Sequence, residues 1–213
     1  ASTPFRNADD FVGFVRAAEN RALLLPKLVA QFGLFGALRL LGKLVKSLKE
    51  PVLPLAATRF YSAVPIKFGP YAAHYALVPH DRAEDGTSAK SRPDYLGEDL
   101  AERLRREPVS YDFQLQFFRD ETLTPIEDGS VEWREADAPF ITIGRLTLPQ
   151  QDTGSPRGRR IAEFVESLSF DPWHATGDFR PLGNMMRARR HAYRLSSIER
   201  GAVPEPDGSE RFA

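Results

Sequence analysis

Residues 21–49 form the most apolar part of the chain, and this segment limits what the chain can fold into. Its large apolar residues recur at helical spacing, and a basic stripe accompanies them in the second half. The apolar positions are Leu25, Leu28, Phe32, Phe35, Leu38, Leu41, Leu44, Val45 and Leu48, and the basic ones are Arg39, Lys43, Lys46 and Lys49. The longest stretch without a charge, Leu28 to Leu38, is shorter than the ~20 residues that a membrane-spanning helix needs.

Two interpretations of residues 21–49 follow from this pattern. One is a helix, or a pair of helices, that covers a hydrophobic core with its apolar face. The other is a surface for contact with lipid, because basic amphipathic helices lie in membrane interfaces. The first interpretation is favoured.

The remaining segments alternate between strand and helix patterns. Helices are predicted at 7–20, 94–106, 161–168 and 185–200, and strands at 59–68, 71–78, 110–119 and 140–148. Residues 80–93 are polar and predict an exposed loop. Antiparallel strands with grouped helices indicate an α+β fold. We expect one domain over residues 1–200, followed by a flexible tail at 201–213.

The composition excludes several kinds of chemistry. The chain has no cysteine, so disulfides, thiolate catalysis, zinc–thiolate sites and iron–sulfur clusters are ruled out. Its 29 basic and 29 acidic residues balance, so no overall field attracts nucleic acid or anionic lipid, although basic residues cluster locally. No signal peptide is visible and the first residue is Ala1 rather than methionine. The chain is therefore expected to be processed or part of something longer, in the cytoplasm rather than the periplasm.

Arg189 and Tyr193 lie four residues apart on the last predicted helix, so their side chains share one face. A phenol ordinarily loses its proton near pH 10, and a ferric ion with an adjacent arginine can stabilise the phenolate at neutral pH. Tyrosinate is a known haem ligand. The spacing alone also fits a packed aromatic ring beside an exposed base. A nucleic-acid surface is a further interpretation, because five basic residues cluster here: Arg187, Arg189, Arg190, His191 and Arg194.

Residues 185–193, Met-Met-Arg-Ala-Arg-Arg-His-Ala-Tyr, resemble the proximal helix of haem catalases, which reads Met-Leu-x-Gly-Arg-x-Phe-Ser/Ala-Tyr. Residues 161–172 resemble the catalase stretch Phe-Ala-Glu-Val-Glu-Gln-x-x-Phe-x-Pro, and residues 139–148 resemble the preceding strand Pro-Leu-Ile-x-Val-Gly. Residues 3–11 resemble a shortened Asn-Thr-Pro-x-Phe-Phe-x-Arg-Asp-x-x-x-Phe. The best match is to small bacterial catalase-related proteins.

The resemblance implies part of a catalase-like antiparallel β-barrel with flanking helices, a bound haem b and a peroxide substrate. Tyr193 would be the axial ligand of the iron, with Arg189 as the partner of its phenolate. Arg200 would pair with a haem propionate, and Met185 and Phe170 would line the proximal face of the porphyrin. Phe11 would stack over the distal face. The resemblance also implies a homo-oligomer.

The sequence departs from the catalase pattern in three places. Leu195-Ser196-Ser197 replaces the Asp-Thr-Gln/His that follows the tyrosine, and Ser2 stands where the distal asparagine is expected. The distal histidine of a His-Ala-Lys-Gly-like motif has no counterpart among His74, His80, His174 and His191. We therefore expect a preceding segment of a hundred or so residues to carry the distal arm.

The sequence leaves three hypotheses about function open. The first is a haem-dependent enzyme acting on hydrogen peroxide or on an organic or fatty-acid hydroperoxide. The second is a haem- or lipid-binding module without catalysis. The third is an interaction protein that uses the basic last helix.

Overall fold

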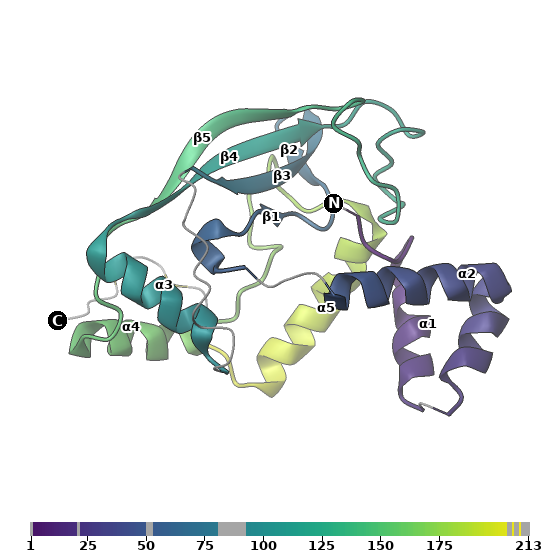
Figure 1. Ribbon diagram of the computed structural model, residues 1–213, viewed down its shortest axis with the longest axis horizontal. Coiled ribbons are helices and arrows are strands. Elements are labelled where there is room, and N and C mark those ends of the chain that lie inside the picture. The colour runs from purple at the N-terminus through teal and green to yellow at the C-terminus, as the bar shows by residue number, and fades with distance from the viewer. Residues whose placement is uncertain are drawn as a thin grey trace.

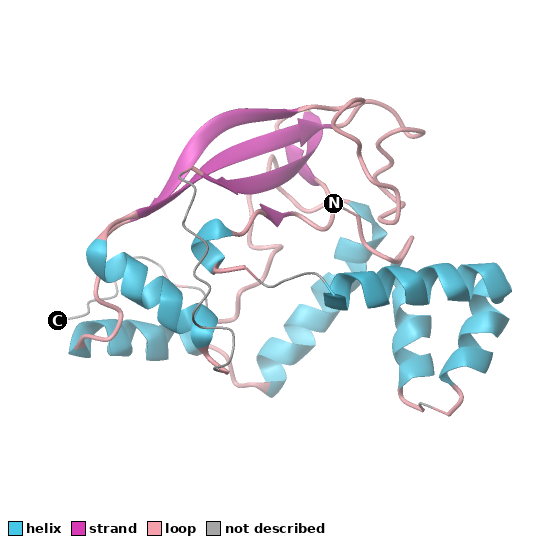
Figure 2. Cartoon of the chain, in the orientation of Figure 1, coloured by secondary structure: helices cyan, strands magenta, loops and turns pink. Residues whose placement is uncertain are grey.

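The computed structural model describes residues 2–20, 22–49, 53–80, 93–203, 206 and 209. A single antiparallel sheet lies above several helices, as Figure 1 shows. Its strands are β1 (Phe60–Tyr61), β2 (Ile66–Phe68), β3 (Tyr71–Pro79), β4 (Val109–Phe117) and β5 (Phe140–Leu148). They pair in the order β1-β3-β4-β5, with β2 also pairing with β3. The expected α+β class is confirmed (Figure 2).

The sheet is open, and this corrects the expectation of a barrel. β5 pairs with β4 on one side, and no described strand pairs with its other side. Three large apolar residues of β5 are also exposed: Ile141, Ile143 and Leu146. The described strands form one curved sheet that does not close on itself, because closure requires the edge strands to pair.

β3 and β4 form the centre of the sheet, with a register that includes Tyr75 opposite Leu115 and His74 opposite Gln116. The predicted strand at 59–68 is divided into β1 and β2 after Ser62. Ser62 N still donates to Tyr75 O, but Tyr75 N donates to the Ser62 side chain, so the regular pairing ends there. Gly69 makes the turn between β2 and β3 with φ of 59°. This left-handed backbone favours glycine.

The first two helices form an antiparallel pair at one end of the molecule (Figure 1). α1 (Ala8–Ala18) begins as predicted at Asn7, whose side chain accepts a hydrogen bond from Asp10 N. α2 (Leu24–Lys49) is interrupted at Gly33, where φ is 70° and ψ is 168°. The core of this region contains Phe5, Ala17, Leu28, Ala37 and Leu40, so a helix pair over a core is confirmed for residues 22–49.

Three further helices lie below the sheet (Figure 2). α3 (Tyr95–Arg106) follows the sequence prediction, whereas α4 (Pro156–Glu166) begins five residues earlier than predicted. It begins there because the Ser155 side chain accepts a hydrogen bond from Gly158 N, and Pro156 suits the first helical position. α5 (Gly183–Glu199) covers most of the predicted last helix.

Two predicted segments, the loop and the tail, lie largely outside the described residues. In the predicted loop at 80–93, residues 81–92 lie outside the described residues. In the predicted tail, most residues beyond 203 also lie outside them. At the start of that tail, Val203 N donates to Ser167 O at 2.8 Å and Ala202 N donates to Ser197 O at 2.9 Å.

Candidate haem site on the last helix

The segment before α5 is fixed to the sheet, and this sets where the helix begins. Lys67 N of β2 donates to Arg180 O, and Leu182 N donates to Pro65 O. Gly183 then has φ of 82°, and a Cβ there would lie 2.9 Å from Ile126 O. Both the backbone angle and the close approach require glycine at this position.

Glu127 anchors the first turn of α5. Its carboxylate accepts hydrogen bonds from Asn184 N at 2.8 Å and from the Arg187 guanidinium at 2.9 and 3.0 Å. The arginine, with help from Asn184, lowers the pKa of Glu127 below its ordinary value. A carboxylate at a helix N-terminus is also favoured by the helix dipole. Asn184 Oδ1 in turn accepts from Ala8 N, which ties α1 to α5.

Trp173 supports the middle of α5 from the irregular segment that precedes it. Its indole Nε1 donates to Met186 O at 3.0 Å, and the guanidinium of Arg190 lies 5.2 Å from the centre of its ring. Met186 is itself buried. The helix is therefore held at its start and along one side, which leaves its second half to present Tyr193.

Arg189 and Tyr193 meet as their spacing predicts. Arg189 donates a hydrogen bond to the Tyr193 hydroxyl, and its guanidinium carbon lies 5.1 Å from the centre of the tyrosine ring. Arg189 also points toward the sulfur of Met186 at 3.7 Å.

Tyr193 lines a cavity of about 300 Å³ on this side of α5. Three predicted site residues line the same cavity: Phe170, Tyr193 and Arg200. The others that line it are Ser169, Ala192, Ser196 and Ser197. The cavity thus combines a phenol, an aromatic ring, a cation and small hydroxyl side chains.

The two serines of α5 were named in the sequence only as departures from the catalase pattern. Ser196, Ser197 and Arg200 follow Tyr193 by three, four and seven residues, so all four positions share one helix face. That spacing could have identified the serines as cavity residues before the structure was known.

Phe170 has an unusual backbone conformation at the mouth of this cavity. Its φ is 52°, and it is the one non-glycine residue with positive φ in the described part of the chain. Its side chain is also 54% exposed. A bulky residue in the left-handed region costs of order 1–3 kcal/mol, and such residues cluster at functional sites.

Two predicted site residues lie elsewhere. Met185 is half-buried at the start of α5 and does not line the Tyr193 cavity. Phe11 lies on α1, where its ring packs edge-on against Phe5 at 5.3 Å, and it does not line the cavity either. Their roles toward a porphyrin stay predictions.

None of the four histidines is among the residues that line the Tyr193 cavity. His74 is buried in the sheet, where its Nδ1 lies 2.9 Å from Ser62 Oγ and 3.1 Å from Ser62 O. Burial lowers its pKa to about 4, so it is neutral at physiological pH. His80 lies beside Asp112 and Arg145 on the sheet. The described residues also include no cluster of three or more histidine and carboxylate ligands for a metal ion.

Comparison with solved structures places this geometry in a known fold. A fungal catalase matches 93% of the chain with a TM-score of 0.63 at 15% sequence identity. Catalase A from Saccharomyces cerevisiae matches 94% of the chain with a TM-score of 0.59, also at 15% identity. The fold is catalase-like.

Sequence comparison points in the same direction. The chain is 30% identical over 143 residues to a catalase-related peroxidase from Mycolicibacterium paratuberculosis, an alignment that covers 62% of the chain. No protein-family model matches the sequence. The catalase-like chain spans less than half the length of each of these proteins: 42% of the peroxidase, 44% of the fungal catalase and 45% of the yeast catalase.

Proposed function

We propose that this chain forms the tyrosine-bearing side of a haem site in a catalase- or peroxidase-like enzyme that processes peroxides. The observation that carries the proposal is the environment of the Tyr193 hydroxyl. It receives a hydrogen bond from Arg189 and lines a cavity whose other walls supply an aromatic ring and a cation. The catalase-like fold and the related peroxidase support the same chemistry.

The donor set fits a haem b group. A tyrosine oxygen is a suitable ligand for ferric iron, so Tyr193 would hold the metal, with Arg189 as the hydrogen-bonding partner of that oxygen. Phe170 would pack against the porphyrin face, with Met185 completing the apolar side. Arg200 would pair with a propionate, because guanidinium and carboxylate groups form charge-assisted hydrogen bonds. Phe11 would stack on the distal face. When bound, the haem supplies a redox-active iron at which peroxides react.

A hemin titration tests the ligand assignment. The intact protein should give the absorption spectrum of a ferric tyrosinate complex, and Tyr193→Phe should abolish it. Tyr71→Phe is the matched control, because Tyr71 is 61% exposed on β3 and does not line the cavity. If Tyr193→Phe binds hemin with an unchanged spectrum, the assignment is wrong.

Arg189 is assigned as a positioning residue that acts through the tyrosine. Arg189→Gln removes the positive charge and should move the loss of the ferric tyrosinate spectrum to higher pH on acid titration, while Arg189→Lys should restore part of the shift. The direction follows because the phenolate loses its cationic partner. An unchanged pH profile for Arg189→Gln would remove arginine from the proposal.

A haem-binding module without catalysis is the second candidate. It is considered because none of His74, His80, His174 and His191 stands in a His-Ala-Lys-Gly-like motif, and peroxide chemistry of the catalase kind uses a distal base. Turnover by the hemin-loaded protein separates the two candidates. Consumption of hydrogen peroxide, cumene hydroperoxide or a fatty-acid hydroperoxide above that of free hemin supports the enzyme. A full ferric tyrosinate spectrum with no turnover supports the binding module.

A further inference from the structure

The second half of α2 exposes a ridge of large apolar side chains. Phe35 is 82% exposed, Leu34 is 56% exposed, Leu38 is 55% exposed and Val45 is 50% exposed. At 100° per residue, these four positions fall on one side of the helix, away from the buried Ala37 and Leu40. We call Leu34, Phe35, Leu38 and Val45 the apolar ridge. Exposed apolar patches of this kind mark interaction surfaces.

A basic stripe borders the apolar ridge along the same helix. It consists of Arg39, Lys43 and Lys46, which are exposed. They have no ion-pair partner among the residues that the structure describes. Residues 22–49 contain no aspartate or glutamate at all. The surface is therefore apolar on one side and positively charged beside it, with no negative charge of its own.

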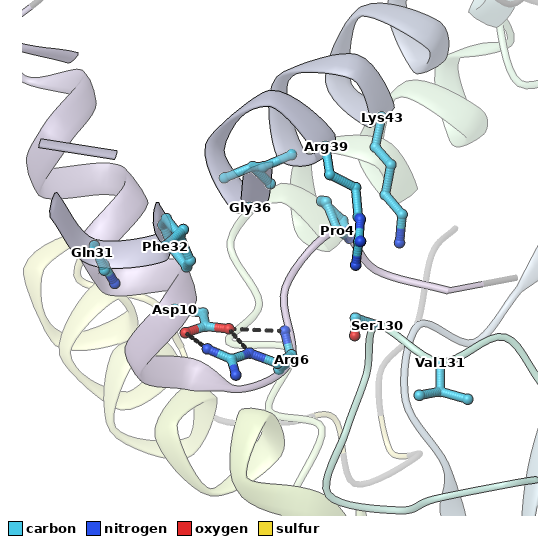
Figure 3. Close-up of a pocket in the computed structure, with 11 residues that line it drawn as sticks. Pro4, Arg6, Asp10, Gln31, Phe32, Gly36, Arg39, Lys43, Ser130 and Val131 are labelled. Atoms are coloured by element: carbon cyan, nitrogen blue, oxygen red, sulfur yellow. Dashed lines mark hydrogen bonds and ion pairs between the residues drawn. The ribbon is translucent and has the colours of Figure 1, made fainter. Parts of the chain in front are cut away.

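Arg39 and Lys43 also reach into a pocket of about 620 Å³ between α2 and the loop at Ser130. Figure 3 shows both side chains extending from the helix toward Pro4 and Ser130. The third cation of the pocket, Arg6, is already bonded to Asp10 at 2.8 Å. The available positive charge in this pocket thus comes from α2, and an anionic group could enter between the two side chains.

The geometry of α2 favours lying on a bilayer over crossing it. Leu24–Lys46 has a mean hydropathy of 1.5, and its length and composition would allow it to span a membrane. However, the backbone leaves the helical conformation at Gly33, and Figure 1 shows that the helix bends sharply there. At ~1.5 Å per residue, the part from Leu34 to Lys49 extends roughly 24 Å, less than the ~30 Å of the hydrocarbon core.

We propose that the second half of α2 docks onto the surface of an anionic lipid bilayer. The apolar ridge enters the boundary between headgroups and acyl chains, and Arg39, Lys43 and Lys46 bind the lipid phosphates. Charge complementarity selects this partner, because a helix with cations, no carboxylates and an exposed apolar side matches a negatively charged apolar interface. The proposal goes beyond the haem site and does not depend on it.

Vesicle sedimentation tests the docking with the whole chain. Vesicles of phosphatidylcholine with phosphatidylglycerol should bind the protein, and vesicles of phosphatidylcholine alone should bind it at least tenfold more weakly. Binding to the anionic vesicles should fall as salt is raised, because screening weakens the attraction of the cations. Equal binding to both kinds of vesicle, or none to either, overturns the proposal.

Two sets of variants locate the surface. Arg39→Gln with Lys43→Gln should lower the partition coefficient on anionic vesicles about thirtyfold, since each cation near the surface contributes ~1 kcal/mol. The control is Arg157→Gln with Arg194→Gln, which removes the same charge from other helices and should change binding by less than about threefold. Equal losses in the two pairs would show a nonspecific charge effect and overturn the assignment to α2.

Phe35→Ser with Leu38→Ser tests the apolar ridge in the same assay. The pair should lower binding to anionic vesicles by at least about tenfold, because both side chains lose their burial in the bilayer. The control is Leu195→Ser with Ile198→Ser, two residues of α5 that are each 67% exposed. Circular dichroism checks that each variant is folded. If the ridge pair keeps wild-type vesicle binding and instead loses a dimer seen by sedimentation, the ridge contacts a second copy and the lipid proposal is wrong.

Discussion

Two regions of the chain combine aromatic rings with hydrogen-bonding groups: the sheet interior around Trp133 and the cavity beside α5. Trp133, from the connection between β4 and β5, is 3% exposed, and Gln116 of β4 is 1% exposed. Gln116 donates from Nε2 to Trp133 O and Ala138 O. Beside α5, Phe170 is 54% exposed and Tyr193 faces an open cavity.

The difference separates residues that are buried in the fold from residues that we propose bind a ligand. Among the described residues of this region, the side chains of Gln116 and His74 both have hydrogen-bond partners within the chain. The α5 cavity instead keeps an aromatic ring exposed in a strained backbone conformation, which stability alone does not favour. Substitutions in the two regions should therefore separate loss of stability from loss of haem binding.

Trp133→Ala should give the largest loss of stability, about 4 kcal/mol in the free energy of unfolding. The indole packs against His74 at 4.4 Å and donates from Nε1 to Pro125 O, and large-to-small changes at buried aromatic residues cost 3–5 kcal/mol. Urea unfolding measures the loss. The matched variant Tyr193→Phe should cost less than about 1 kcal/mol, and an equal loss for both would erase the distinction between the two regions.

Acidification should destabilise the protein through His74. An unfolded histidine takes up a proton near pH 6.5, whereas burial holds the pKa of His74 at about 4. Between these values the unfolded state binds more protons, so the free energy of unfolding falls as the pH drops from about 6.5 to about 4. The full effect is about 3 kcal/mol, and the contribution of His74 to the free energy of unfolding is constant above that window.

Urea unfolding at several pH values measures this dependence. His74→Asn should remove it, while His191→Asn on the exposed side of α5 should leave it in place. A pH dependence that survives in His74→Asn would assign the effect to another group.

Glu127→Gln should have a smaller effect, about 1 kcal/mol, because the carboxylate and its arginine partner are both largely exposed. The pKa of Glu127 is lowered by Arg187, so its contribution is present above its ordinary pKa and lost as the pH falls through the lowered value. A double-mutant cycle with Arg187→Gln measures the coupling. Asp178→Asn, which breaks an exposed pair with Lys67, is the control.

Weakening this anchor should also lower hemin affinity at the proposed haem site, because Glu127 fixes the first turn of the helix that carries Tyr193. Glu127→Gln should lower hemin affinity several-fold more than Asp178→Asn does. Equal affinities in the two variants would show that α5 is positioned without this contact.

Local sequence patterns predicted most of the helices and strands and the contact between Arg189 and Tyr193 at the candidate site. The strand at 140–148 has the predicted bounds, and the i to i+4 spacing of Arg189 and Tyr193 predicted their contact. Both follow from fixed periodicities of the backbone. The resemblance to catalases is supported at the level of the fold.

Features that depend on distant residues were not predictable in the same way. The position of the interruption of α2 at Gly33 was not predicted, because the helical pattern of residues 21–49 fits one helix or a pair of helices equally well. The division of the strand at 59–68 depends on the Ser62 side chain meeting Tyr75 thirteen residues later. The left-handed backbone of Phe170 has no sequence signal, since its side chain disfavours that conformation.

Phe170→Gly should give the smallest change in stability, and its effects on stability and on hemin affinity should differ most clearly. Glycine adopts a φ of 52° without strain, so the free energy of unfolding should not fall and should rise by up to about 1 kcal/mol. The gain is small because glycine also loses more backbone entropy on folding. Hemin affinity should nevertheless fall about tenfold, because the ring that would pack on the porphyrin is gone.

Phe179→Gly is the control, since Phe179 is 49% exposed but packs on Phe68 away from the cavity, and it should lose stability and keep hemin affinity. A Phe170→Gly protein that is less stable and binds hemin as before would place Phe170 with the sheet interior, as a residue selected for packing.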